Sequence, residues 1–190
     1  MSNIFALHEC PRVSAKALAD RHIIKMPVET VQMLVSALLI SDVPSRMMPL
    51  TKAGESHKGG YAHHPATTWT AECFENWWWL LKHGLALCKE YTARYGKVHF
   101  AEGQLHTLRI YNINHSVDKH IPRIGEMTPF ERCFNQSVGR NIDLLDTHNW
   151  PCEHAAYQEF YKREKSALLY TRSVYESMRD CFTDLLKTTY

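Results

Sequence analysis

The sequence predicts a single, predominantly all-α domain over residues 1–190, a compact helical bundle with long irregular loops. Two observations predict this class. Apolar residues recur at helical spacing over long stretches, and no segment beyond the first few residues alternates like a strand. Hydrophobic residues make up 45% of the chain and charged residues 22%, so the chain has enough apolar side chains for a folded core.

The first half predicts two helices and a long connection. Ser14 is placed to cap a helix over residues 15–25. Pro27 would break a helix interior but suits a first turn, so a second helix is expected over residues 27–40. Residues 41–65 are rich in Pro, Gly, Ser and His and predict a loop of a length that often carries function.

The second half centres on one long predicted helix. Pro65 stands near its start and Gly96 just after its end, the asymmetry typical of helix ends. The other expected segments are an extended start at 1–10, a helix at 97–113, an irregular stretch at 114–135, and one or two helices at 152–187.

Composition also limits the classes of function. The formal net charge of +2 is too small to indicate nucleic-acid binding by itself. Six cysteines without a Cys-x-x-Cys pair, and no signal-like start, predict a reducing, cytoplasmic compartment. No apolar run reaches the roughly 18 residues that a membrane span needs, and the His and Cys spacings match no strong zinc template. We therefore expect neither a membrane, a metal nor a cofactor.

A polar stripe runs along the predicted 65–95 helix between two apolar arcs. Its members are Glu72, Asn76, His83, Glu90 and Arg94. One interpretation is a solvated edge with a weak Glu90–Arg94 ion pair. The other is the wall of a polar cleft that faces a ligand.

The segment DRHIIKMPVETVQ, residues 20–32, carries a second stripe. On one helix, His22, Lys25, Glu29 and Gln32 would share a narrow face opposite the apolar residues. Such a face can be merely solvated, or it can combine groups suited to proton transfer or anion binding. Near the C-terminus, Tyr161 and Lys165 share a helical face that is either solvated or contacts phosphate.

Three segments together resemble an uncharacterised protein family of tailed bacteriophages. They are D-x-H-x-x-K-M-P-x-E-T-x-Q-M-L at 20–34, His-Pro at 64–65 with the following Trp, Glu and Asn up to E-Y-x-x-R-Y-G-K-x-H at 90–99, and Y-x-x-(aromatic)-Y-x-x-x-K-S at 157–166. The chain departs from the pattern at His63, where Asn is expected. The resemblance implies a phage origin and location in the host cytoplasm. It also implies a looser association with enzymes of thymidine hypermodification in DNA, such as amino acid:DNA transferases and thymine pyrophosphorylases.

We therefore expect an enzyme of the transferase or glycosylase-like type that acts on a modified pyrimidine in double-stranded DNA, with an amino acid or amine as a possible co-substrate. A non-catalytic binder of a host or defence protein, and a purely structural polar network, are the alternatives. The two stripes are expected to converge on one pocket. The expected catalytic residues are Asp20, His22, Lys25, Glu29 and Glu90. The expected substrate-binding residues are Gln32, His64, Trp69, Glu72, Asn76, Tyr91, Arg94, His99, Tyr161 and Lys165.

Overall fold

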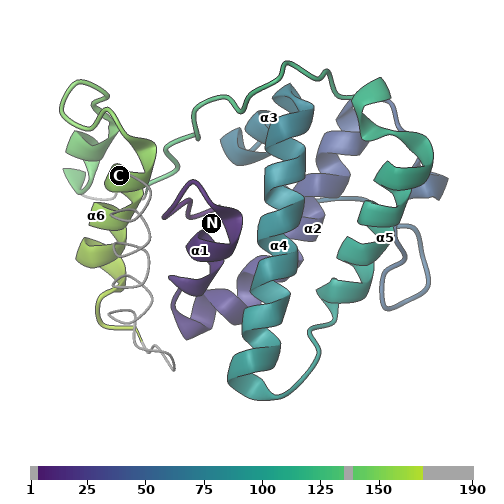
Figure 1. The fold of residues 1–190 in the computed structure, drawn as a ribbon, viewed down its shortest axis with the longest axis horizontal. Coiled ribbons are helices and arrows are strands. Elements are labelled where there is room, and N and C mark those ends of the chain that lie inside the picture. The colour runs from purple at the N-terminus through teal and green to yellow at the C-terminus, as the bar shows by residue number, and fades with distance from the viewer. Residues whose placement is uncertain (1–3, 135–138, 169–190) are drawn as a thin grey trace, which may run out of the picture.

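The computed structural model describes residues 4–134 and 139–168 and has the predicted helical architecture (Figure 1). In these residues the only β pairing is an isolated bridge between Leu50 and Ser56. The helices are α1 (Pro11–Lys16), α2 (Asp20–Ile40), α3 (Pro65–Glu72), α4 (Phe74–Tyr95), α5 (Ala101–His115) and α6 (Glu153–Lys165), with 3-10 turns η1 (Ser45–Met47), η2 (Val117–Lys119) and η4 (Ile142–Leu145).

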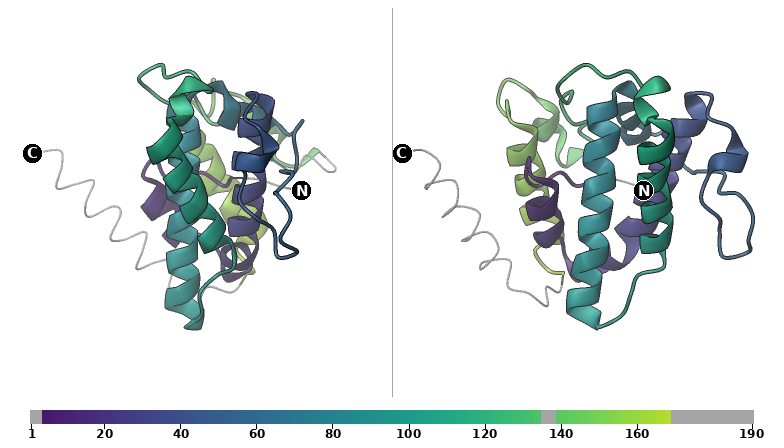
Figure 2. Two further views of the ribbon diagram at one scale, coloured as in Figure 1. Left: turned by 90° about the vertical axis from the view of Figure 1, so that its right-hand side faces the viewer. Right: turned by 45° about the vertical axis from the view of Figure 1, so that its right-hand side comes forward.

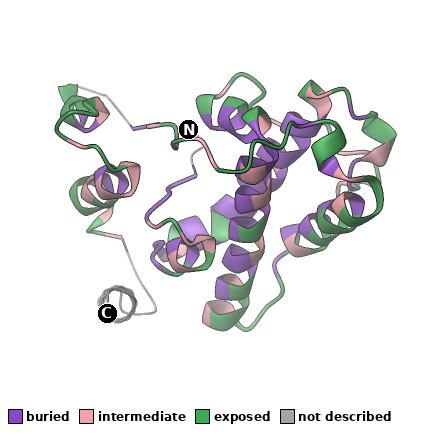
Figure 3. Cartoon of the chain, turned by 45° about the horizontal axis from the view of Figure 1, so that its top comes forward, coloured by how far each residue is buried: buried purple, intermediate pink, exposed green. Residues whose placement is uncertain are grey.

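Helices α2 and α4 pack against each other at the centre of the molecule (Figure 1). They approach each other closely at Gly84, where an added Cβ would lie 2.6 Å from the Thr30 methyl group. The Trp77 indole donates to the Leu34 carbonyl across the same contact. Figure 3 shows buried residues along α4 and exposed residues along the outer side of α5.

Helix α2 differs from the prediction because it runs without a break through Pro27. Proline removes one helical hydrogen bond and crowds the carbonyl groups of the preceding turn. His99 Nε2 lies 3.0 Å from the Ile24 carbonyl oxygen, so the imidazole satisfies one of the carbonyls that the proline disturbs. His99 Nδ1 accepts from the Ala101 amide, which fixes the proton on Nε2.

By length and composition alone, α2 is also long and apolar enough to cross a membrane. The sequence pattern did not predict such a helix. The most apolar window of α2 has a mean hydropathy of 1.6, and 67% of it is buried against the rest of the protein. The core helix of a folded domain meets the same criterion, and α2 has that position here.

The predicted 65–95 helix is two helices. Cys73 is extended, with φ −150° and ψ 159°, and separates α3 from α4. The Phe74 amide donates to the Pro122 carbonyl at 2.9 Å, so a distant segment satisfies the start of α4. A partner 48 residues away in the chain has no signature in the local helical pattern.

Two expected features at the N-terminus are also corrected. Residues 4–10 form no strand in the described part of the chain. Ser14 lies inside α1 rather than at its cap, and its hydroxyl bonds both Phe5 and Leu7 of the preceding segment. Helix α6 covers that segment from the other side, because Gln158 donates to the Leu7 carbonyl. Predicted helical residues beyond 168 lie outside the described residues.

Candidate functional site

Glu29 is a buried carboxylate on α2 with few partners. Its side chain is 4% exposed, and the Lys25 ammonium lies 2.7 Å from Oε1 in an i,i+4 ion pair. No aligned hydrogen-bond donor among the described residues meets either carboxylate oxygen. Lys25 itself is 52% exposed, so the pair connects a buried acid to the surface. A buried carboxylate that lacks donors is costly for the fold and therefore calls for an explanation.

His64, the N-cap residue of α3, lies near this carboxylate. Its Nδ1 accepts from the Ala66 amide, which leaves Nε2 as the position for a proton. Burial lowers the pKa of His64, and the negative charge of Glu29 acts in the opposite direction. His64 is therefore biased toward a neutral imidazole beside an acid, an arrangement suited to proton transfer.

The loop before α3 is fixed on α2 next to Glu29. The Ser36 hydroxyl donates to the Gly60 carbonyl at 2.9 Å and accepts from the Gly60 amide at 2.8 Å. Gly59 has φ +74°, and a Cβ there would lie 2.2 Å from Ser36 Oγ. Gly60 packs against the Gln32 side chain, which places the predicted Gln32 in this wall.

Tyr61 was not expected in the site. It follows the glycines with φ +61°, is 44% exposed, and meets the His64 ring edge to face at 6.5 Å. Non-glycine residues rarely hold such a backbone conformation, and they tend to do so at functional sites. The only feature of the sequence that could have indicated a role for Tyr61 is its position directly after Gly59-Gly60.

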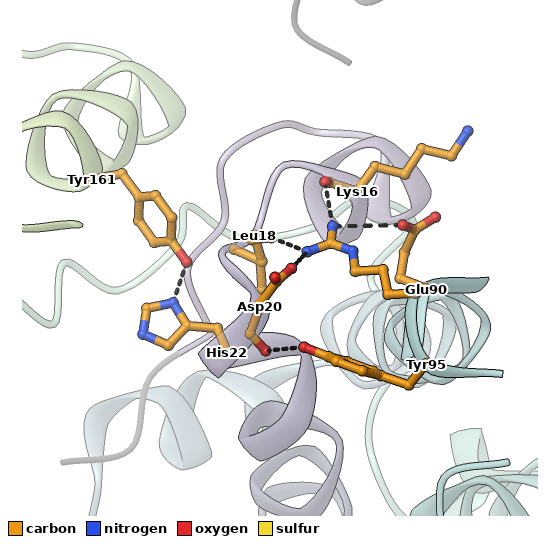
Figure 4. Close-up of polar contacts among 8 residues, drawn as sticks. Lys16, Leu18, Asp20, His22, Glu90, Tyr95 and Tyr161 are labelled. Carbon is orange, nitrogen blue, oxygen red and sulfur yellow. Dashed lines mark hydrogen bonds and ion pairs between the residues drawn. The ribbon is translucent and has the colours of Figure 1, made fainter. Parts of the chain in front are cut away.

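His22 lies two turns before Glu29 on α2 and contacts α6. Its Nδ1 meets the Tyr161 hydroxyl (Figure 4). Its ring also stacks on Phe5, with 4.5 Å between the ring centroids. Burial, then the charges of Lys165, Lys25 and Arg21, lower the pKa of His22 to about 4. The expected residues His22, Tyr161 and Lys165 are thus close together, and Lys25 connects them electrostatically to Glu29.

Asp20, Glu90 and Arg94 form a separate cluster on the other side of the α2 N-terminus. The Arg94 guanidinium is 1% exposed and lies 2.8 Å from Asp20 Oδ1 and 3.5 Å from Glu90 Oε2. It also donates to the carbonyl of Lys16, the last residue of α1, and to that of Leu18 in the turn before α2 (Figure 4). The 20–32 segment meets the stripe of the 65–95 region here through Asp20, which lies outside the face of His22, Lys25, Glu29 and Gln32. The ion pairs and carbonyl contacts of Arg94 hold the α1–α2 turn.

The other expected residues divide between two places. Tyr91 contacts the ring of His99 at 4.8 Å, beside the kink of α2. Asn76 donates to the Trp69 carbonyl and to the Thr128 hydroxyl, and the same hydroxyl donates to Glu72. These groups tie α3, α4 and the 122–130 segment together. The expected single pocket is therefore divided, and only the residues around Glu29 and His22 combine acid, base and aromatic groups with an exposed cation.

In the described residues no three His, Cys, Asp or Glu side chains group as metal ligands do. Residues 3–102, just over half of the 190, match a family model described as pyrimidine dimer DNA glycosylase. Comparison with curated proteins and with solved structures finds no match. The family match covers Glu29, Lys25, His64 and His22, but not α6.

The match corrects the expected family. The sequence motifs were associated with an uncharacterised phage family and with thymidine hypermodification, whereas the matched model is that of a glycosylase family that acts on pyrimidine dimers. The coarser expectations, an enzyme and a DNA substrate containing an altered pyrimidine, agree with it. The predictions of transferase activity, a hypermodified base and an amine co-substrate came from the association with thymidine hypermodification, and the family match does not support them.

Proposed function

Because the chain belongs to the pyrimidine dimer DNA glycosylase family, we propose that it excises a pyrimidine of a dimer from DNA with Glu29 as its acid–base group. The observation that carries the assignment of Glu29 is its burial without an aligned hydrogen-bond donor. A structural carboxylate in this position would be expected to have donors, as the Asp20 carboxylate has in Arg94. Location in the cytoplasm stays a prediction.

The chemistry explains why a desolvated carboxylate is useful. Excision breaks the bond between C1′ of the deoxyribose and N1 of the pyrimidine, and positive charge develops on the sugar as the base leaves with the bonding electrons. In glycoside cleavage generally, a carboxylate stabilises such a cation or removes a proton from the attacking nucleophile. A fixed negative charge in a site that excludes water does this most strongly.

A lyase step would require an amine as the nucleophile. The amine forms a bond to C1′ while the base departs from it with the bonding electrons, and the nitrogen then loses a proton. The nitrogen lone pair next expels O4′, which takes up a proton as the sugar ring opens, and this leaves an iminium ion at C1′. A base then removes a C2′ proton, and the 3′ phosphate leaves by β-elimination. Glu29 is the carboxylate available for that proton. Lys25, half exposed beside Glu29, is a candidate for the amine or for a contact with the neighbouring phosphate.

The surrounding side chains suit an extruded nucleotide. Enzymes that act on a base in a duplex must move it out of the stack, and aromatic side chains commonly receive it. Tyr61 is exposed beside His64 and can stack on such a base, whereas His22 and Tyr161 are buried against each other behind the α2 face. The positively charged Lys25 and Lys165 lie near His22, where they can hold flanking phosphates.

The test is Glu29→Gln on a duplex oligonucleotide with one defined cyclobutane pyrimidine dimer. We expect excision to fall by about 10²–10⁴-fold, the range for loss of an acid–base group, while the melting temperature stays within a few degrees. Glu55→Gln, at an exposed loop carboxylate, is the matched control and should keep full activity. Wild-type excision by Glu29→Gln would overturn the assignment.

Borohydride trapping tests the lyase step separately. Reduction of the iminium ion would join the chain covalently to DNA, and peptide mapping would identify the amine. Loss of the covalent adduct in Lys25→Ala, with binding of the dimer duplex retained, would assign the nucleophile to Lys25. A normal adduct in Lys25→Ala would instead leave Lys25 as a phosphate contact.

A further inference from the structure

We infer that a groove between α1, α4 and α5 binds a single-stranded segment of DNA as a second DNA site, which goes beyond the proposed excision reaction. The groove lies on the side of α4 away from α2. Gly84 and Trp77 of α4 face α2, whereas Lys82 and Lys89 are exposed on another side of the helix. In Figures 1 and 2, α4 and α5 form one layer and α2 lies behind it.

The groove is basic throughout. It has a volume of about 460 Å³, and no acidic side chain lines it. The side chains that give it its character are four cations and two apolar residues: Arg12, Lys82, Lys89, Arg109, Trp78 and Leu85. A groove with one sign of charge and a low-dielectric floor concentrates ions of the opposite sign.

These four cations have no carboxylate partner among the described residues. Other arginines are paired: Arg94 with Asp20, Arg123 with Glu75 and Arg163 with Asp143. Arg12, Lys82, Lys89 and Arg109 take part in none of the ion pairs found in residues 4–134 and 139–168. Their charge is therefore available to an external anion, and DNA is the polyanion on which the family acts.

Trp78 supplies a stacking surface at one end. Its indole is partly exposed and stacks on Phe74 with 6.1 Å between ring centroids and 12° between planes, so it is held in place. Sites for single strands combine a basic track along the backbone with aromatic side chains that stack on unpaired bases. A duplex does not offer unstacked bases, which is why we assign a single strand.

The groove also has a defined end. Beyond Trp78 it adjoins a larger cavity of about 750 Å³ that carries three carboxylates, Glu9, Glu75 and Glu126, beside the cations Lys82 and Arg123. The carboxylates make this cavity less favourable for phosphates than the groove, and Glu75 accepts from the amides of residues 124 and 125. The strand should therefore run from Trp78 along Lys82 and Lys89, not toward the acidic cavity.

The test measures binding of fluorescent dT15 to the full chain by anisotropy, alone and with one equivalent of an unlabelled dimer duplex. The triple variant Lys82→Gln, Lys89→Gln, Arg109→Gln removes three groove charges. The matched control Arg46→Gln, Lys97→Gln, Lys119→Gln removes three exposed charges elsewhere. The groove variant should bind dT15 at least tenfold more weakly, and the slope of log K against log salt should fall by about 2.

The control variant should bind dT15 within twofold of wild type, and both variants should excise the dimer normally at saturating duplex. Trp78→Ala should weaken dT15 binding about tenfold. Equal dT15 binding by wild type and the groove variant would overturn the proposal, as would equal losses in the two triple variants. Stronger capture of a 15-bp duplex than of dT15 by the groove would overturn the single-strand assignment. Because dT15 is not cleaved, failure here would leave the excision reaction untouched.

Discussion

Arg94→Met provides a sharp test of whether the Asp20–Arg94–Glu90 cluster is structural. The guanidinium is 1% exposed and donates to Asp20 Oδ1 at 2.8 Å. It also donates to the Leu18 carbonyl at 2.8 Å and the Lys16 carbonyl at 2.9 Å. Methionine keeps much of the length of the side chain but removes all of these donors and the charge.

The expected loss of folding free energy follows from the Asp20 carboxylate, which stays partly buried without its cation. Removing one partner of a buried ion pair typically costs about 3–5 kcal/mol, because the other charge stays buried without compensation. The Asp20 side chain is 15% exposed, so water can reach part of it, and we expect a value near 3 kcal/mol. For a chain of this size, about 2–4 °C of melting temperature is lost per kcal/mol, which gives a decrease of roughly 10 °C.

Urea unfolding followed by circular dichroism measures the free energy, and dimer excision is measured well below the melting temperature. Arg123→Met is the control, because Arg123 is 54% exposed and its ion pairs should contribute less than about 1 kcal/mol. Arg94→Met should excise dimers within a few-fold of wild type. A loss of stability below about 1 kcal/mol, or lost excision in a fully folded variant, would refute the structural role.

Three further changes test other parts of the structure. Burial lowers the pKa of His83 to about 3, so unfolding exposes a group that takes up a proton near pH 6.5. The contribution of His83 to the free energy of unfolding is complete above pH 6.5 and should fall by about 2 kcal/mol by pH 5, in addition to the loss from His22, whose pKa is also lowered. Urea unfolding measured across pH should therefore show a smaller fall in His83→Leu. Gly59→Ala should cost about 1–3 kcal/mol in urea unfolding, because its Cβ would collide with Ser36 Oγ at a positive φ; an unchanged midpoint would show that the loop is not fixed there. Tyr161→Phe should cost about 1 kcal/mol by leaving His22 Nδ1 without its partner, and unchanged stability would argue against that contact.

The sequence could predict the Glu29 site to the extent that the site is local. His22, Lys25 and Glu29 share a face because helical periodicity alone places them there, and that holds although Pro27 intervenes. The start of α2 was predicted wrongly because Pro27 was taken as a helix boundary. The imidazole that contacts the Ile24 carbonyl beside the proline belongs to His99, which is 75 residues away in the chain.

Long-range partners explain the remaining differences. Arg94 was expected to bind substrate because a helical wheel shows a charge beside Glu90. It does not show the carbonyls of Lys16 and Leu18, which are more than 70 residues away in the chain. Likewise, the break between α3 and α4 depends on the hydrogen bond from the Phe74 amide to the distant Pro122 carbonyl, so the local sequence pattern could not predict it. Helical patterns specify faces, whereas the choice between a ligand and a structural partner depends on which segment packs there.

The two hydrogen bonds between Ser36 and Gly60 have a consequence for how DNA must reach Glu29. Since the glycine loop is fitted to α2 with no room for a Cβ at Gly59, opening it would break both bonds and lose the close packing. In the proposed reaction at Glu29, the deformation would therefore fall on the nucleic acid and not on this loop. A rigid receptor of this kind favours duplexes in which damage has already weakened stacking, because these cost the least to distort.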